Sequence, residues 1–353
     1  HPYVPALAMP TVPWEGRLAC IEAGTCMYGC RIEAKSSTDV TYVRKAERTG
    51  RVEIRTGCVV REIELDTAGK ARGVIYFDDN KVEHRAEARA VVLAANAIET
   101  PRLLLLSRSA RFPAGLANSS GLVGKCLLDH LDAGILGRSE QPLDGWKGVP
   151  VSAMVQDFYE TNPRNSFARG WLLEVSTGGS WPIALAKRIG GWGSAHKAAM
   201  KHRFGHEFSI FGAGEQMPDE RNQVVLDLDV TDRFGLPVPK IFSQARGNDL
   251  PLLSAMSQSI RDLVAAMGVK EILSEWSHAP GASTHYMGTC RMGQDPGRSV
   301  VDRWGRAHDV PNLFIADAST FVTAGAAHPT LTLMALAART SHYMVDAFKK
   351  GDL

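Results

Sequence analysis

The chain has 353 residues, of which 44% are apolar and 22% are charged, and its formal net charge at pH 7 is +2. A chain of this length can bury a sizeable core, so we expect one large or two moderate domains. Its basic residues are interspersed with acidic ones, which excludes the clustered positive charge of a nucleic-acid-binding protein. No apolar run is long enough to predict a transmembrane helix. The Pro-rich first residues, HPYVPALAMPTVPWEG, have no signal-peptide pattern, which leaves the compartment open.

Half of the six cysteines lie close together near the N-terminus, at Cys20, Cys26 and Cys30. Their C-x5-C-x3-C spacing lacks the paired C-x2-C units of a typical zinc site. Three soft thiolates can hold an iron–sulfur cluster, two of them can form a disulfide, or all three can be redox-silent residues of a structural loop. The spacing leaves these three interpretations open.

The stretch from residue 51 to residue 96 favours β-structure. Apolar residues alternate with polar ones in VEIRTGCVVREIELD, ARGVIYFDD and KVEHRAEARAVVLAAN, which predicts a three-stranded ribbon or meander. The end of the last segment, Ala90–Ala95, is a short continuous apolar run, so we expect burial on both faces. It leads into NAIETPRLLLLS, where Pro101 is expected to open a helix.

The middle of the chain, from about residue 131 to residue 278, is irregular in composition, with scattered Trp, Gly and Arg. Within it, VVLDLDVTDRFGLPVPKI contains Gly235 and Pro237, which supply the chemistry of a turn, and the family resemblance described below implies two sheet strands joined by that turn. The segment LPLLSAMSQSIRDLVAAMG has helical spacing of its apolar residues and predicts a helix that ends at Gly268.

Two histidines in small-residue loops mark the C-terminal part, on either side of a short apolar strand expected at 312–316. His285 precedes this strand, Asp317 follows it, and His328 stands before Pro329, which opens a long helix to about Phe348. Either histidine alone could be an ordinary loop residue beside a core helix. A side chain that titrates near neutral pH is also suited to accept a proton in catalysis.

The ordered motifs of this part resemble a known family. The blocks H-x-M-G-T-C-R-M-G, N-L-F-I-x-D-A-S and H-P-T-x-T, which begin at His285, Asn312 and His328, are similar to the C-terminal part of the glucose–methanol–choline (GMC) flavoprotein oxidoreductases. The resemblance implies an α/β fold with an FAD-binding domain and an antiparallel-sheet substrate domain. It also implies that His285 and His328 are the catalytic pair, one as base and the other as hydrogen-bond partner of the substrate oxygen.

The same resemblance implies which residues hold FAD. Val60 would lend its backbone to the adenine, the strand Ala90–Ala95 would rejoin the main sheet, and the helix at Pro329 would direct its positive end at the flavin ring. Asp317 would contact the cofactor through its adjoining backbone, although its side chain could equally cap the following turn. His130, in a segment that also resembles the family, is interpreted as structural. The implied cofactor-binding residues are Val60, Ala95, Asn96, Asp317, Ala318, Pro329, Thr330 and Thr332.

The GMC-like motifs occur at both ends of the chain and thin out between them. We therefore expect residues 1–128 and 279–353 to form the FAD-binding domain and residues 129–278 the substrate domain. No strand–GxGxxG–helix unit is present, and the chain does not begin with Met. We interpret it as N-terminally incomplete, with the dinucleotide unit removed or supplied by another chain.

The expected function is FAD-dependent oxidation of a CH–OH group of a sugar, polyol or related alcohol, with electrons passed to an acceptor other than oxygen. The cysteine spacing is similar to that of GMC sugar dehydrogenases with an iron–sulfur cluster, except that Arg31 replaces their usual proline. An electron-acceptor subunit is a possible partner beside the missing N-terminal segment. The alternatives are an oxidase of the same fold that uses O2, and a non-catalytic scaffold subunit derived from a flavoprotein.

Overall fold

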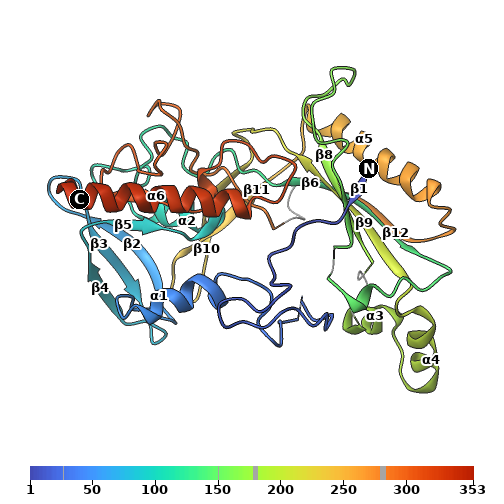
Figure 1. Cartoon of the computed structure of the whole chain (residues 1–353). Coiled ribbons are helices and arrows are strands. Elements are labelled where there is room, and N and C mark those ends of the chain that lie inside the picture. Colours follow the sequence, from blue (N-terminus) through green and yellow to red (C-terminus); the bar gives the residue numbers. More distant parts are fainter. Residues whose placement is uncertain (27, 150, 178–181, 279–283) are drawn as a thin grey trace. The chain divides into compact units, whose positions relative to one another are not determined.

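The computed structural model describes residues 1–26, 28–149, 151–177, 182–278 and 284–353 (Figure 1). The chain divides into two compact units. The first, the sheet unit, consists of His1–Ile54, Asp132–Gly214 and Pro251–Ser277. The second, the α6 unit, consists of Arg55–Leu131, Glu215–Leu250 and His278–Leu353. The boundary predicted at residue 279 lies outside the described residues, and the assignment of FAD-binding and substrate domains stays a prediction.

A six-stranded sheet dominates the sheet unit, with the strand order β1-β7-β8-β9-β6-β12. The pairs β1–β7, β7–β8 and β8–β9 are antiparallel, as expected for this part of the chain. Buried Leu172, Leu173, Phe208 and Ile210 form part of its core. The strands are β1 (Pro2–Tyr3), β6 (His130–Arg138), β7 (Ala153–Val155), β8 (Trp171–Ser176), β9 (Glu207–Glu215) and β12 (Glu271–His278).

Helix α5 (Asp249–Ala266) confirms the helix predicted from apolar spacing. Its buried residues Leu252, Met256, Ile260 and Val264 follow one another every four residues and so form one stripe. Gly268, at φ +68°, ends the helix as predicted. The other helices of this unit are α1 (Arg44–Arg48), which continues a π-helical turn (Asp39–Val43), a 3₁₀ turn (Gly145–Lys147), α3 (Pro182–Ile189) and α4 (Gly193–Arg203).

The α6 unit contains the predicted three-stranded ribbon, formed by β2 (Val59–Leu65), β3 (Ala71–Phe77) and β4 (Glu83–Glu87). All of its pairs are antiparallel. The first strand begins at Val59, so the predicted strand residues before it, from residue 52 on, are not in β-structure. The ribbon packs through Ile63 and Ala71 into the core of this unit.

A short parallel pair lies next in the α6 unit, formed by β5 (Val91–Leu93) and β13 (Leu313–Ile315). Val91 and Leu93 are buried, but Val92 between them is 45% exposed. The prediction that this strand is buried on both faces is therefore wrong. Successive side chains point to opposite faces of a strand, and one face of β5 is left open to solvent.

Helix α2 (Asn96–Leu106) begins five residues before the predicted start at Pro101, which lies inside it. The Asn96 side chain starts the helix by accepting hydrogen bonds from the backbone N–H groups of Ile98 and Glu99. Proline has no N–H for the carbonyl four residues earlier, that of Ala97. The Thr289 hydroxyl donates to that carbonyl at 2.8 Å. This distant donor lets the helix continue through Pro101.

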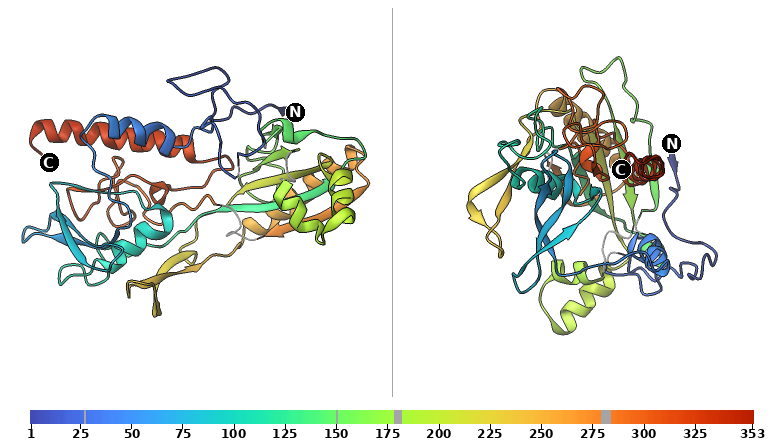
Figure 2. Two further views of the ribbon diagram at one scale, coloured as in Figure 1. Left: turned by 90° about the horizontal axis from the view of Figure 1, so that it is seen from below. Right: turned by 90° about the vertical axis from the view of Figure 1, so that its left-hand side faces the viewer.

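The predicted pair of strands after residue 222 is an antiparallel hairpin of β10 (Gln223–Thr231) and β11 (Pro237–Phe242), which extends from the rest of its unit (Figure 2). The Asp232 carboxylate closes the turn by accepting the N–H groups of Phe234 and Leu236, and Gly235 there adopts φ +81°.

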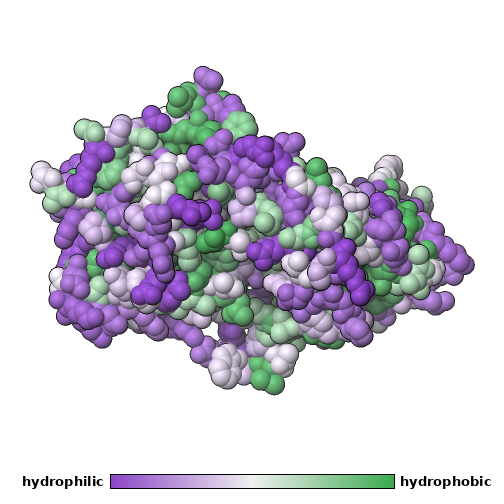
Figure 3. Space-filling view, turned by 90° about the horizontal axis from the view of Figure 1, so that it is seen from above, coloured by the Kyte–Doolittle hydropathy of each residue, from purple (hydrophilic) through white to green (hydrophobic). Residues whose placement is uncertain are grey.

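Helix α6 (Thr330–Lys350) confirms the predicted C-terminal helix, with Pro329 at its N-cap and Gly351 ending it at φ +81°. A 3₁₀ turn (Ala318–Thr320) connects β13 toward it. None of the helices in the described part of the chain is long and apolar enough to cross a membrane. The face drawn in Figure 3 intersperses hydrophilic with hydrophobic side chains.

Replacing Thr289 with Val should lower the free energy of unfolding by about 1–3 kcal/mol, because the buried Ala97 carbonyl then has no donor. Thr289→Ser, which keeps the hydroxyl, is the matched control. In a Pro101→Ala background the helix supplies its own N–H, so the cost should fall to about 1 kcal/mol or less. Urea unfolding of Thr289→Val, Thr289→Ser, Pro101→Ala and the double variant Pro101→Ala/Thr289→Val measures these costs. An equal cost of Thr289→Val in both backgrounds would contradict the proposed hydrogen-bond replacement.

Candidate active site

An antiparallel bridge between two distant segments sets the geometry of the site. The backbone N–H of Leu128 donates to the Met287 carbonyl, and the N–H of Met287 donates to the Leu128 carbonyl, both at 2.9 Å. Two residues beyond the bridge on each segment stand His130 and His285. In an antiparallel register such residues face each other on the same side of the pair.

The rings of three histidines form a row in the α6 unit. The ring centroids of His130 and His285 are 4.9 Å apart with the planes at 89°. Those of His285 and His328 are 5.3 Å apart with the planes at 79°. The structure therefore brings together the two histidines that the sequence singled out and adds His130, which was interpreted as structural.

Exposure to solvent rises along the histidine row. His130 is 1% exposed, His285 is intermediate, and His328 is exposed. The bridge residues Leu128 and Met287 form a small apolar cluster with Phe321 and Ala324. Leu333 and Leu336 of α6 pack against this cluster, so the helix that follows His328 shares its support with the bridge that orients His285.

The segment after His285 is fixed to the 3₁₀ turn by three backbone hydrogen bonds. The N–H groups of Gly288, Cys290 and Met292 donate to the carbonyls of Ala318, Ser319 and Thr320, at 3.1, 2.8 and 2.9 Å. Gly288 adopts φ +90°, and a Cβ there would lie 2.4 Å from the Cys126 carbonyl oxygen. Glycine is required at this position for its conformation and for its lack of a side chain.

Asp317 is buried, and the protein itself uses both of its carboxylate oxygens. One accepts the Thr100 hydroxyl at 2.5 Å and the other the N–H of Ser319 at 2.8 Å. The Thr100 hydroxyl in turn accepts the N–H of Ala95 at 3.1 Å. The Asp317 side chain is thus the N-cap of the 3₁₀ turn, the second of the two readings that the sequence left open. A contact of the adjoining backbone with a cofactor stays a prediction.

Several predicted cofactor residues follow the carboxyl ends of parallel strands. Leu93 and Ile315 pair with each other at the ends of β5 and β13. Ala95 and Asn96 come just after the first strand, and Asp317 with Ala318 just after the second. The carboxyl edge of a parallel sheet is where such folds bind ligands.

The N-terminus of α6 is the second feature that suits a cofactor. Pro329 caps it without a side-chain hydrogen bond, and no acidic residue lies in its first turn. Thr330 and Thr332 in that turn are exposed. The first N–H groups of α6 and the positive end of its helix dipole therefore lie at the end of the helix next to His328.

Val60 lies apart from these residues in the secondary structure. It belongs to β2, where it pairs with Tyr76 and packs, partly buried, against the core of the unit. This position fits an ordinary core residue, and any cofactor contact of Val60 stays a prediction.

Charged and polar groups support the His130 end of the row. The N–H of Asp129 donates to Gln216 Oε1 at 3.0 Å, and the N–H of His130 donates to Asp129 Oδ1 at 2.8 Å. Burial, and then the negative charge of Asp129, raises the pKa of Tyr286, the residue after His285.

The three N-terminal cysteines lie in the sheet unit as free thiols around one small cavity. Burial raises the pKa of Cys26, and so do the thiolate charges of Cys20 and Cys30. Burial opposes ionisation of Cys30 as well, but backbone N–H groups, led by that of Lys35 at 3.4 Å, lower its pKa overall. Across the described residues, no set of three or more His, Cys, Asp or Glu side chains is arranged to hold a metal.

Sequence reasoning missed Thr100 and Thr289 as supports and did not connect His130 with His285. Thr100 and Thr289 act by hydrogen bonds to residues far away in the chain. The one signal for His130 is that it follows Leu128 by two residues, just as His285 precedes Met287 by two. This spacing becomes informative only once the bridge between Leu128 and Met287 is known.

Comparisons with known proteins place these observations in a family. Models described as GMC oxidoreductase match residues 17–132 with an N-terminal model and residues 218–337 with a C-terminal one. The 2-methyl-1,2-propanediol dehydrogenase of Mycolicibacterium austroafricanum is 35% identical, over 97% of this chain and 63% of that protein. The fructose dehydrogenase large subunit of Gluconobacter japonicus is 33% identical, over 96% and 62%.

Solved structures agree at the level of the fold. Pyridoxine 4-oxidase from Mesorbium loti superimposes with a TM-score of 0.59 at 20% identity, over 88% of this chain and 60% of that one. This likeness and the family models confirm the α/β GMC-type fold class expected from the sequence. The chain spans a little over three fifths of the length of the curated relatives named above.

Replacing Gly288 with Ala should destabilise the protein more than the same change at Gly121. Both glycines have positive φ, so both variants bear the left-handed strain of about 1–2 kcal/mol. A Cβ at Gly121 meets nothing within 4 Å, whereas one at Gly288 meets the Cys126 carbonyl. Overpacking should add about 1–3 kcal/mol, measured as the difference in urea unfolding free energy. Equal losses would show that close approach is not what requires glycine.

Proposed function

The chain belongs to the GMC oxidoreductase family, and on that premise we propose that it serves FAD-dependent oxidation of a CH–OH group of a sugar, polyol or related alcohol. The observation that carries the proposal is the contact of His285 with His328, next to the open N-terminus of α6. The names of the two curated relatives, a diol dehydrogenase and a fructose dehydrogenase subunit, support this substrate class.

In the proposed reaction the two histidines share one substrate oxygen. One imidazole accepts the hydroxyl proton, and the other donates a hydrogen bond to the same oxygen and stabilises its developing negative charge. Rings at 79° to each other and 5.3 Å apart can direct one nitrogen each to a common point, which two stacked rings cannot. When bound, FAD would supply the acceptor for the hydride of the same carbon.

The residues of the α6 unit fit part of an FAD site. Ala95, Asn96, Asp317 and Ala318 would offer backbone groups at the carboxyl edge of the parallel pair, since the Asp317 and Asn96 side chains are occupied with local capping. Pro329, Thr330 and Thr332 would present the first turn of α6 to the flavin ring, where a helix N-terminus favours negative charge. Val60 would contribute its backbone from β2.

These roles lead us to propose that residues 55–131 and 278–353 of the α6 unit carry the FAD-binding function. The antiparallel sheet between 129 and 278 would then form much of the substrate side. This proposal differs from the division expected from the sequence, because residues 1–54, expected in the FAD-binding domain, belong to the sheet unit.

For the electron acceptor we propose a partner other than oxygen. Both curated relatives are named dehydrogenases, and the fructose enzyme is named a large subunit, which implies association with at least one other subunit. An electron-accepting subunit is therefore a proposed partner here. The solved structural relative is named an oxidase, so use of O2 is the alternative, and oxygen consumption with a turned-over alcohol distinguishes the two.

A non-catalytic scaffold is the alternative of another class. A scaffold needs neither the ring contact of His285 with His328 nor an uncapped helix N-terminus beside them. The absorption spectrum of oxidised flavin in the purified full-length protein would support the enzyme, and its lack under reconstitution with FAD would support the scaffold.

Cys20, Cys26 and Cys30 remain candidate ligands of an iron–sulfur cluster. Their shared cavity and mutual charge effects support a common site, whereas the described thiols are not arranged as a metal site. We therefore include no electron transfer through a cluster in the proposed reaction, and a structural role for the loop stays equally open.

Replacing His285 or His328 with Ala in the flavin-loaded full-length protein should lower kcat by roughly 10²–10⁴-fold, the usual range for a lost acid–base group. His342→Ala, at an exposed histidine of the same unit, is the matched control and should leave kcat unchanged. Steady-state rates with an artificial acceptor measure the effect. Near-normal rates after both replacements would dispose of the proposed roles.

If the cysteine loop holds a cluster, iron and acid-labile sulfide should copurify with flavin, and Cys26→Ser should remove both. Rapid-mixing spectroscopy should then show flavin reduction intact and transfer to the external acceptor lost. Cys58→Ser, at a cysteine outside the loop, is the control. Iron at background level in freshly purified full-length protein would assign the three cysteines a structural role.

A further inference from the structure

His130 is a buried, chemically capable side chain that the proposed reaction does not use. It is the first residue of β6 and is 1% exposed. Its ring meets that of His285 edge to face, with centroids 4.9 Å apart and planes at 89°. The centroid of His328 lies slightly farther from that of His285, at 5.3 Å.

The backbone of His130 is anchored more firmly than an ordinary strand end. Its own N–H donates to Asp129 Oδ1, and the N–H of Asp129 donates to Gln216 Oε1. The bridge of Leu128 with Met287 fixes its position along the chain opposite His285. The position of the His130 ring is therefore set by backbone contacts that do not involve the His285 side chain.

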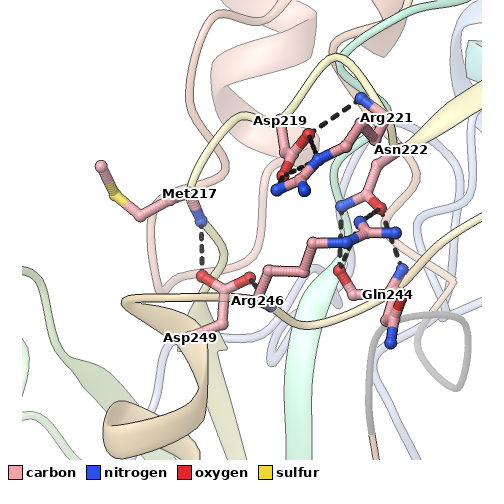
Figure 4. Close-up of polar contacts among 7 residues, drawn as sticks. All are labelled: Met217, Asp219, Arg221, Asn222, Gln244, Arg246 and Asp249. Atoms are coloured by element: carbon pink, nitrogen blue, oxygen red, sulfur yellow. Dashed lines mark hydrogen bonds and ion pairs between the residues drawn. The ribbon is translucent and has the colours of Figure 1, made fainter.

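A polar network next to Gln216 supports these backbone contacts. The N–H of Met217 donates to Asp249 Oδ1 at 3.1 Å, and the N–H of Arg246 donates to Asp249 Oδ2 at 3.3 Å (Figure 4). The Arg246 side chain then donates to Asn222 Oδ1 at 2.7 Å. Asp249 and Asn222 are buried, so these contacts of the segment that follows Gln216 are shielded from competing water.

We propose that His130 is a positioning residue for His285. Rotation about the last side-chain torsion of a histidine is broad and nearly two-fold, so backbone geometry alone does not fix the plane of the His285 ring. A perpendicular ring packed against it blocks that rotation and keeps one His285 nitrogen directed to the substrate oxygen. The proposal rests on the proposed function for its catalytic consequence, but the ring contact itself is independent of it.

The test replaces the ring of His130 in two ways in the flavin-loaded full-length protein. His130→Phe keeps a flat ring of similar size, and His130→Gln keeps a polar side chain without a ring. The Phe variant should retain kcat within about threefold, whereas the Gln variant should lose about 10–10²-fold in kcat, the cost of a misplaced catalytic group, with KM little changed. Thermal melting and flavin content identify variants that fail to fold.

A second measurement needs no catalysis. In wild-type protein with ¹³C-labelled histidine, a nuclear Overhauser cross-peak should connect ring protons of His130 and His285. Its absence would overturn the proposal whatever the kcat values of the two variants. The peaks are assigned with the His130→Phe and His285→Ala variants.

The remaining outcomes also decide the matter. Wild-type kcat in the Gln variant would show that the ring has no positioning role. Equal losses in folded Phe and Gln variants would show that a His130 nitrogen acts, which contradicts positioning by packing. A wild-type protein that binds FAD but oxidises no alcohol would remove the proposed function, while the cross-peak would still report on the contact.

Discussion

The site depends on one pair of backbone hydrogen bonds, those that join Leu128 to Met287. This bridge connects segments that are far apart in the chain and fixes which residues face each other beyond it. A shift of one residue in that register would turn His130 or His285 to the opposite side of the pair. The apolar cluster of Leu128, Met287, Phe321 and Ala324 opposes such a shift, because the shift would move these buried side chains into solvent.

Around the bridge, side chains rather than extended sheet join the GMC-like blocks of sequence into one unit. Thr289 reaches α2, and Thr100 of α2 reaches Asp317 after β13. Each of these contacts satisfies a buried backbone or carboxylate group that would otherwise be costly. A few short polar side chains therefore act together with the backbone hydrogen bonds between the His285 loop and the 3₁₀ turn to hold these segments beside the end of the parallel pair.

The elements that could be predicted from the sequence are those with local causes. Helix α6 follows from Pro329 and its apolar run, and the β10–β11 hairpin from the turn at Asp232–Leu236. The predicted start of α2 was wrong because a proline usually lies in the first turn of a helix. Here Pro101 lies inside the helix, and the Thr289 hydroxyl supplies the donor that proline lacks. The proximity of His285 and His328 was expected only through family resemblance, and the contact of His130 depends on a pairing that no local pattern encodes.

The graded exposure of the three histidines gives the row a direction. A molecule in solvent can contact the exposed ring of His328, whereas the buried ring of His130 is shielded from it. Under the proposed function, a substitution next to His328 would therefore act on the bound molecule directly. A substitution at His130 would act only through the ring of His285.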